Sequence, residues 1–200
     1  MAASIDFYFD FSSPYGYIGS TKIEQLAARH ARSVTWRPML LGAAFKATGM
    51  SPLPQVPLKG DYAKRDFGRS ARYHGAPFKY PSTFPISTVA AARAFYWLNG
   101  KDPKKAVELA KALLKAYFVD DVNISDAENV IRIATAAGCK ADEVRAALND
   151  QTVKDQTKAE VDAALAKGVF GSPYVVIDGE PFWGVDRFDQ VDKWLASGGW

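Results

Sequence analysis

The chain has 200 residues, and 48% of them are hydrophobic, which predicts a fully packed globular core and argues against a disordered chain. Its net charge is +3, and lysines and arginines alternate with aspartates and glutamates along the helical stretches, so we expect no nucleic acid partner. The single cysteine, Cys139, excludes an intramolecular disulfide and a multi-cysteine metal site, and we expect no metal.

The N-terminal residues contain neither a basic start nor an unbroken apolar run, so we expect no secretory signal. No apolar stretch is long enough to cross a bilayer, so we expect no membrane segment and no membrane partner. A single cysteine is also typical of proteins from a reducing compartment. Together these features predict a cytoplasmic protein.

The beginning of the chain predicts a strand, a helix and a second strand. Residues 5–11 are strong strand formers, and the pattern stops at the Ser-Ser-Pro sequence of 12–14. Apolar residues then recur at near-helical spacing over 15–31, and the preceding proline occupies the first helical position, where proline is tolerated. Residues 33–37 are mostly β-branched or aromatic and predict the second strand.

The middle of the chain predicts a loop followed by helices. Residues 49–60 carry three prolines between two glycines, which is typical of a loop or a boundary. Ser125 and Glu128 have the spacing of a capping box that opens one helix, and Gly138 can end it. Helical segments with an apolar stripe are expected near 61–74, 87–98, 103–118, 126–137, 141–149 and 152–166.

The end of the chain returns to strands. A turn at 170–173 precedes strand formers at 174–177, and Asp178-Gly179 predicts a hairpin turn into a further strand at 181–183. A final amphipathic helix follows, with Asp186 as its candidate N-cap.

This order of elements predicts an α/β protein with a thioredoxin-like fold that is split by an inserted all-helical domain. Residues 1–48 and 167–200 are expected to form the thioredoxin-like domain, and residues 49–166 the helical insertion domain. Ser13 then stands where such a fold usually carries a redox cysteine, so we expect the protein to activate the thiol of another molecule.

The junction of the first strand and the first helix is the first candidate site. Unpaired N–H groups and the positive end of the helix dipole favour an anion there, such as a thiolate. His30 and His74 have no triad spacing, which argues against Ser13 as an acylated nucleophile. Ser13 is instead a candidate hydrogen-bond donor to sulfur. The alternative is that Ser12 or Ser13 merely caps the helix.

Three further positions are candidates for binding a peptide-like ligand. Pro173, after Ser172, leaves the preceding backbone free to pair with an extended peptide if its peptide bond is cis, and the alternative is an ordinary turn proline. Asp186 is a candidate to hold a ligand ammonium as well as an N-cap candidate. Lys59 is a candidate partner of a ligand carboxylate, and the alternative is a solvated lysine.

Several stretches carry a family pattern over nearly the whole chain: Asp-Phe-Tyr-Phe-Asp-Phe-Ser-Ser-Pro-Tyr at 6–15, Trp-Arg-Pro-Met-Leu-Leu-Gly at 36–42, Lys-Gly-Asp-Tyr at 59–62, Val-Phe-Gly-Ser-Pro at 169–173 and Phe-Trp-Gly-Val-Asp-Arg at 182–187. In this order and spacing they resemble the 2-hydroxychromene-2-carboxylate isomerases and the kappa-class glutathione transferases, within the DsbA-like branch of the thioredoxin superfamily. The resemblance implies glutathione as the cofactor and a homodimer.

The resemblance also implies which residues bind glutathione. Ser13, rather than Ser12, matches the serine that contacts the sulfur, and a hydroxyl that donates to a thiolate lowers the thiol pKa. The other implied contacts are Tyr15, Met50 through its backbone, Lys59, Ser172, Pro173, Val185, Asp186 and Arg187.

The implied reaction is a glutathione-dependent isomerisation in aromatic compound degradation. A 2-hydroxychromene-2-carboxylate ring opens to give trans-o-hydroxybenzylidenepyruvate. Tyr15 is a candidate for the substrate pocket, and Phe84, Pro85 and Trp183 are candidates for its walls, with core packing as the alternative for these three. Residues 80–87 depart from the asparagine-containing stretch of the relatives, which leaves the second substrate open.

Three other functions remain in competition. A kappa-class transferase or peroxidase shares the glutathione site and conjugates an electrophile instead. A non-catalytic peptide-binding or chaperone module uses the same fold. A disulfide oxidoreductase is least favoured, because the chain has no CxxC motif.

Overall fold

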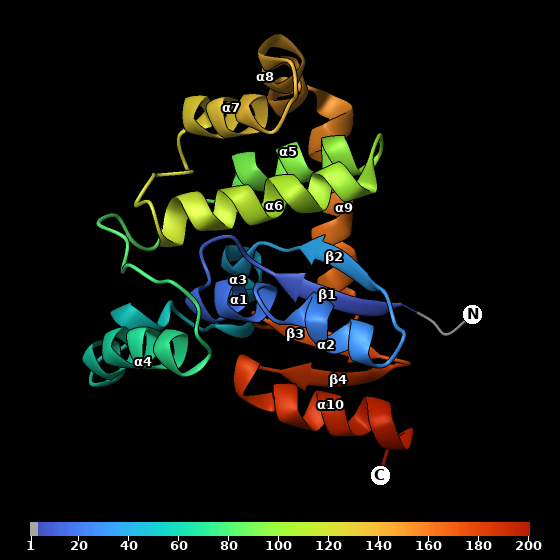
Figure 1. Cartoon of the computed structure of the whole chain (residues 1–200). Coiled ribbons are helices and arrows are strands. Elements are labelled where there is room, and N and C mark those ends of the chain that lie inside the picture. Colours follow the sequence, from blue (N-terminus) through green and yellow to red (C-terminus); the bar gives the residue numbers. More distant parts are fainter. Residues whose placement is uncertain (1–3) are drawn as a thin grey trace.

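A four-stranded sheet lies at the centre of the molecule, a computed structural model that describes residues 4–200 (Figure 1). The strands are β1 (Ile5–Phe9), β2 (Val34–Pro38), β3 (Tyr174–Ile177) and β4 (Glu180–Trp183), in the spatial order β2-β1-β3-β4. β1 is parallel to β2 and antiparallel to β3, which pairs antiparallel with β4. The mixed sheet confirms the predicted thioredoxin-like fold.

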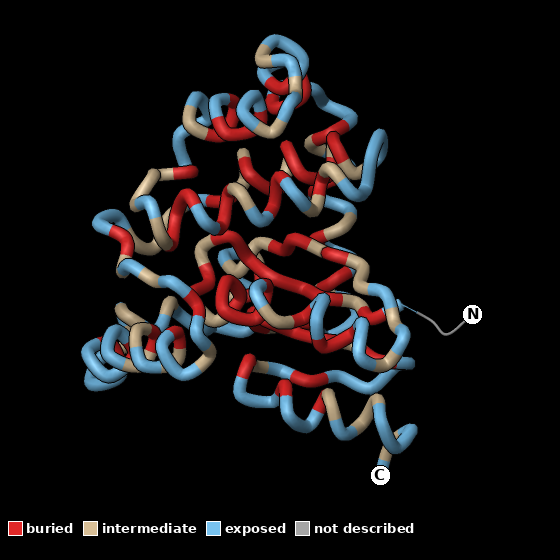
Figure 2. The backbone as a smooth tube through the Cα atoms, in the orientation of Figure 1, coloured by how far each residue is buried: buried red, intermediate tan, exposed pale blue. Residues whose placement is uncertain are grey.

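β1 is an interior strand with a neighbour on each side, and its side chains are buried along almost its whole length. Phe7 stands opposite Trp36 of β2 and Val175 of β3. Phe7 and Phe9 pack against the Trp36 ring with ring centroids 5.3 Å apart in each pair, an edge-to-face geometry that aromatic rings favour. Figure 2 shows this strand as a mostly buried segment at the centre of the molecule.

Helices flank the sheet and fill the long segment between β2 and β3. The predicted helices of that segment are all present, with ends shifted by three residues or fewer. The helices are α1 (Pro14–Ser20), α2 (Ile23–Arg29), α3 (Leu41–Thr48), α4 (Lys59–Tyr73), α5 (Val89–Asn99), α6 (Pro103–Phe118), α7 (Ala127–Ala136), α8 (Ala141–Asn149), α9 (Gln151–Ala166) and α10 (Phe188–Ser197), and short 3-10 turns lie at Leu53–Gln55 and Val185–Arg187.

Two elements near the N-terminus differ from the prediction. The helix expected over 15–31 is two helices, because the hydroxyls of Ser20 and Thr21 bond back to carbonyls of α1 and end it there. Helix α3 was not predicted, because its short sequence follows a proline-closed strand and its N-cap, Leu40, makes no side-chain cap.

Two predicted caps are also wrong by one residue. Asp126, not Ser125, is the N-cap of α7, and its carboxylate accepts from the Glu128 N–H at 2.9 Å, whereas Ser125 bonds to Asn123. The last helix, α10, has Arg187 as its N-cap, because Asp186 lies within the preceding 3-10 turn.

The helices gather into groups around the sheet (Figure 1). Helix α5 contacts α6, α7, α8 and α9. Figure 1 shows α5 to α8 gathered above the sheet, and α9 running from them down behind the strands. Helix α4 lies apart from that group and contacts α1. The order of elements agrees with a helical segment inserted into a thioredoxin-like core, and the domain boundaries stay a prediction. Within residues 4–200, no helix combines the length and apolarity that a membrane span requires.

Candidate functional site

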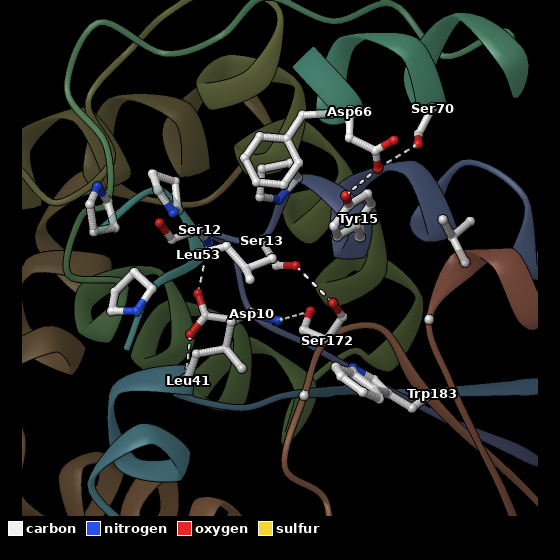
Figure 3. Close-up of a pocket in the computed structure, with 18 of the residues that line it drawn as sticks. Asp10, Ser12, Ser13, Tyr15, Leu41, Leu53, Asp66, Ser70, Ser172 and Trp183 are labelled. Atoms are coloured by element: carbon white, nitrogen blue, oxygen red, sulfur yellow. Dashed lines mark hydrogen bonds between the residues drawn. The ribbon is translucent and has the colours of Figure 1, made fainter. Parts of the chain in front are cut away.

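Ser13 is the N-cap of helix α1 and is 4% exposed. Its hydroxyl oxygen accepts from the Gly16 N–H at 3.0 Å, so the predicted helix cap is real. The same hydroxyl donates to the carbonyl oxygen of Ser172 at 3.0 Å. Figure 3 shows this hydrogen bond between Ser13 and Ser172, which joins the start of α1 to the turn before β3. Ser13 therefore links the two candidate sites predicted from the sequence, the junction of β1 with α1 and the Ser172–Pro173 turn.

Ser12 has a different set of partners. Its hydroxyl accepts from the Ile86 N–H at 3.3 Å, in the segment that leads into α5. Its own N–H donates to the Asp10 carboxylate at 2.7 Å. Of the two serines, Ser13 is thus the one that contacts the turn before β3.

The Ser172–Pro173 peptide bond is cis, the geometry on which the sequence prediction depended. A close approach of α1 holds this turn. A Cβ atom added at Gly16 would lie less than 3.0 Å from the Ser172 hydroxyl oxygen, so only glycine fits there without a shift. Within the described residues 4–200, neither the Ser172 N–H nor the Tyr15 N–H at the second position of α1 has an acceptor. Both N–H groups are available to a ligand.

Trp183 lies over the same turn and is 50% exposed, so it is a wall of a cavity and not core packing. A Cβ atom added at Gly171 would lie less than 3.0 Å from the Trp183 indole nitrogen. The Trp183 ring also packs against Phe170, with ring centroids 4.8 Å apart.

These groups lie on a cavity of about 930 Å³, near the upper end of the size range of ligand sites. The cavity brings together most of the predicted site residues: Ser13, Tyr15, Met50, Phe84, Pro85, Ser172, Trp183, Val185, Asp186 and Arg187. Pro173 is not among the lining residues, although its peptide bond shapes the turn. Lys59 also lies outside the lining and is exposed at the start of α4.

The opposite wall of the cavity is helix α4. The Tyr15 hydroxyl donates to the Asp66 carboxylate, which also receives hydrogen bonds from Arg69 and, at 3.3 Å, from Ser70. The Tyr15, Asp66 and Ser70 contacts are drawn in Figure 3. The Tyr15 ring packs edge to face on Phe67, with centroids 5.1 Å apart. A polar network backed by the Phe67 ring therefore faces Ser13 and Ser172 across the cavity. Together with Gly16, these two residues form the thiol end of the cavity, named for the thiolate that is predicted to bind there.

The charges of this wall are set by the same contacts. Burial raises the pKa of Tyr15 well above its ordinary value, and the hydrogen bond to Asp66 adds to this effect. Burial acts to raise the pKa of Asp66, but hydrogen bonds from Tyr15 and Arg69 outweigh it and hold that pKa below its ordinary value. Tyr15 is therefore neutral and Asp66 ionised at neutral pH.

Asp10 also borders the cavity, although it is only 3% exposed. Its carboxylate accepts from the Ser12 N–H at 2.7 Å, the Leu41 N–H at 2.7 Å and the Thr88 hydroxyl at 3.1 Å. Burial raises the pKa of Asp10, against the lowering effect of these three hydrogen bonds.

The sequence prediction missed three of these polar residues. Asp10 sits in the strand-end pattern that was recognised, but its partners lie 31 and 78 residues away. Asp66 and Arg69 occupy an ordinary charged helix surface with i,i+3 spacing, which gives no sign of Tyr15, 51 residues earlier. The signal in the sequence that could have drawn attention to Asp10 is an aspartate at the end of a largely apolar strand pattern, two residues before Ser12.

Comparisons with known proteins agree with this geometry. Residues 4–196 match the model of the DSBA-like thioredoxin domain. The chain is 28% identical over 200 residues to the 2-hydroxychromene-2-carboxylate isomerase of Sphingobium xenophagum, covering 98% of this chain and 100% of that one. It is 25% identical over 206 residues to glutathione S-transferase kappa 2 of Caenorhabditis elegans, covering 96% and 92%. A solved structure of a 2-hydroxychromene-2-carboxylate isomerase aligns with a TM-score of 0.85 at 22% identity, covering 96% of this chain and 94% of that one.

Proposed function

The chain belongs to the family of DSBA-like thioredoxin domains, and from this premise we propose that it is a glutathione-dependent isomerase of the 2-hydroxychromene-2-carboxylate type. The observation that carries the proposal is the Ser13 hydroxyl, held at the N-cap of α1 against the Ser172 carbonyl. Within residues 4–200 the lining of the cavity contains no cysteine, and its histidine, His74, makes no hydrogen bond with Ser13. Two relatives that match 98% and 96% of this chain are named for this isomerase and for a kappa-class glutathione transferase.

The donor set of the cavity fits glutathione. The Ser172 N–H is free to pair with the backbone of a bound peptide. Asp186 lines the cavity from within the 3-10 turn, and its carboxylate suits the γ-glutamyl ammonium. Ser13 and the Tyr15 N–H converge on the place where a sulfur would lie, at the positive end of α1. Met50, Val185 and Arg187 complete the lining on either side.

Ser13 would act by moving one hydrogen bond. A hydroxyl has a single proton, and that of Ser13 goes to the Ser172 carbonyl in this structure. A thiolate is a stronger acceptor than a neutral carbonyl, because hydrogen bonds to charged groups are roughly twice as strong. The Ser13 proton would therefore turn toward the sulfur and favour its ionised form. Glutathione, when bound, would supply a thiolate that adds reversibly to an unsaturated carbon of the substrate.

The second substrate would occupy the space between this end and α4. Phe84, Pro85 and Trp183 offer apolar surface to an aromatic ring. Tyr15 stays neutral, and its hydroxyl proton is donated to Asp66. Its hydroxyl oxygen can still accept a hydrogen bond from the substrate, such as one donated by a phenolic hydroxyl of the opened ring.

Ser13→Ala tests the proposal. We expect the variant to remain folded but less stable by about 1 kcal/mol, because it loses a helix cap. The rate with glutathione and a 2-hydroxychromene-2-carboxylate should fall, and its rise with pH should move to higher pH, because the thiol loses a donor. An unchanged rate and pH profile would refute this role of Ser13.

A kappa-class conjugating activity is the second candidate, favoured by the kappa relatives that match 96% of this chain. Supplying glutathione with a chlorinated aromatic electrophile, and separately with the hydroxychromene carboxylate, distinguishes the two. The isomerase returns free glutathione after each turnover, whereas the transferase consumes it. Measuring free thiol during the reaction therefore decides between them.

A further inference from the structure

Asp10 joins the segments that surround the thiol end. Its N–H donates to the Ser172 hydroxyl at 3.0 Å, and its carbonyl accepts from the Ser13 N–H at 3.0 Å. Its carboxylate receives the N–H of Ser12 and of Leu41, together with the Thr88 hydroxyl. Every polar group of this one residue is therefore engaged, and Figure 3 shows the Ser12, Leu41 and Ser172 contacts converging on it.

The partners of the carboxylate are the starts of helices. Leu41 is the first residue of α3, and Thr88 is the N-cap of α5. Thr88 makes no side-chain cap for its own helix and gives its hydroxyl to Asp10 instead. The positive ends of α3 and α5 thus face this carboxylate, whereas the start of α1 faces the cavity.

We propose that Asp10 is a positioning residue, whose carboxylate fixes the Ser12–Ser13 turn against α3 and α5 and so sets the thiol-binding geometry at the start of α1. It touches no ligand in this role. On its Ser12 side, the turn between β1 and α1 is otherwise held through the Ser12 hydroxyl, which contacts the Ile86 N–H and the Tyr117 side chain. The consequence for glutathione rests on the proposed function, but the consequence for the geometry of the turn does not.

Asp10→Asn separates geometry from charge. Whichever way the amide is turned, its NH₂ group faces a backbone N–H, of Leu41 or of Ser12, so at least one hydrogen bond to the turn or to α3 is lost. The loss of a negative charge by itself would make a nearby thiol ionise more easily. The loss of the turn geometry would make it ionise less easily. The two effects have opposite signs.

The closing experiment places a thiol at the site itself, so that it does not depend on glutathione binding. Ser13→Cys is made in a Cys139→Ser background, which leaves one thiol in the chain, and its pKa is measured from the pH dependence of alkylation. The measurement is repeated with Asp10→Asn and, separately, with Thr88→Val. The other titratable groups that line the cavity are unchanged in all three proteins: Tyr15, Tyr62, Asp66, Arg69, Tyr73, His74, Asp186, Arg187 and Asp189.

We expect Asp10→Asn to raise the pKa of the introduced thiol. Thr88→Val removes one hydrogen-bond donor to Asp10 and keeps the carboxylate, so it should raise the thiol pKa by less. If Asp10→Asn does not fold, Thr88→Val still tests the proposal. A thiol pKa that is unchanged or lowered in both variants overturns the proposal.

A second arm uses the chain with its native Ser13 and Cys139. Titration with glutathione should show binding about tenfold weaker in Asp10→Asn, the equivalent of one charge-assisted hydrogen bond. Binding of equal strength by a folded Asp10→Asn variant also contradicts the proposal. If the unsubstituted protein binds no glutathione, the proposed function fails, and the thiol pKa of the first arm still decides the role of Asp10.

Discussion

The two ends of the cavity are built in different ways. The thiol end is made of backbone groups that are brought close by glycines, and its key side chain, Ser13, is almost completely buried. The α4 wall is made of side chains, and Arg69, which holds Asp66, is 56% exposed. A site that requires a fixed geometry is thus placed where the chain leaves β1 and enters β3, whereas the wall that faces it rests on a helix connected to the core by few elements.

This contrast suggests a division of roles. The rigid end suits a group that every turnover needs in the same position, which in the proposed function is a thiolate. The α4 wall tolerates substitution more readily, because exposed ion pairs contribute little to stability. We expect the affinity for the thiol ligand to depend on the first region and the choice of second substrate on the other. The predictions below test this division.

Gly16→Ala should have the largest effect on stability. The added Cβ would lie less than 3.0 Å from the Ser172 hydroxyl oxygen and 3.1 Å from the Ser13 Cβ, so α1 must move away from the turn. We expect a loss of about 1–3 kcal/mol in the free energy of unfolding, the usual cost of overpacking, measured by urea denaturation.

Gly68→Ala is the matched control in α4. This glycine is also helical, and an added Cβ would meet only the Arg72 guanidinium, at 3.4 Å. We expect a gain of about 0.5–1 kcal/mol, because alanine is the better helix former. If both variants lose stability to the same extent, the thiol end is no more tightly packed than the wall.

Asp66→Asn should reveal the charge state of the α4 wall through pH. The Asp66 pKa is lowered on folding, so its contribution to stability is present above the pKa of an unfolded aspartate, about 4, and is lost as the pH falls through the lower folded value. Because the Asp66 carboxylate is partly exposed, we expect it to contribute about 0.5–1 kcal/mol to the free energy of unfolding at neutral pH, which Asp66→Asn loses. Thermal unfolding of both proteins between pH 2 and about 7 measures it.

Asp10→Asn should show the opposite dependence. The Asp10 pKa is raised on folding, so the favourable contribution of the carboxyl is present below the unfolded pKa and is lost as the pH rises through the folded value. The difference in stability between the unsubstituted protein and Asp10→Asn should therefore shrink with rising pH, whereas for Asp66→Asn it should grow. Parallel slopes for the two variants would contradict the assigned directions.

The sequence predicted the thiol end far better than the α4 wall, for physical reasons. A proline at the first helical position, a small residue before it and a Gly-Ser-Pro turn before a strand are local signals, and each specifies its own backbone geometry. The Tyr15–Asp66 contact depends on how α4 docks on α1, which no local pattern encodes. The helix caps at Asp126 and Arg187 were missed by one residue, because neighbouring polar side chains competed for the same role.

Tyr15→Phe should separate the two substrates. The ring keeps its packing on Phe67, and the loss of the hydroxyl leaves Asp66 with Arg69 and Ser70 as partners. We expect the glutathione affinity to change by less than about twofold and the KM of the second substrate to rise about three- to tenfold, the equivalent of one hydrogen bond. Steady-state kinetics with each substrate varied in turn measures both. A larger effect on glutathione than on the second substrate would contradict the division of roles.

Lys59→Ala should have the smallest effect. The family resemblance implies an ion pair between Lys59 and a glutathione carboxylate, yet this lysine is exposed at the start of α4 and outside the cavity lining. An ion pair made at such an exposed position contributes about 0–1 kcal/mol, so we expect at most about a fivefold loss of glutathione affinity, which should diminish in high salt. Titration calorimetry at two salt concentrations tests this. A loss of tenfold or more that persists in high salt would mean that Lys59 becomes buried against the ligand, and the start of α4 must then close over the cavity when glutathione binds.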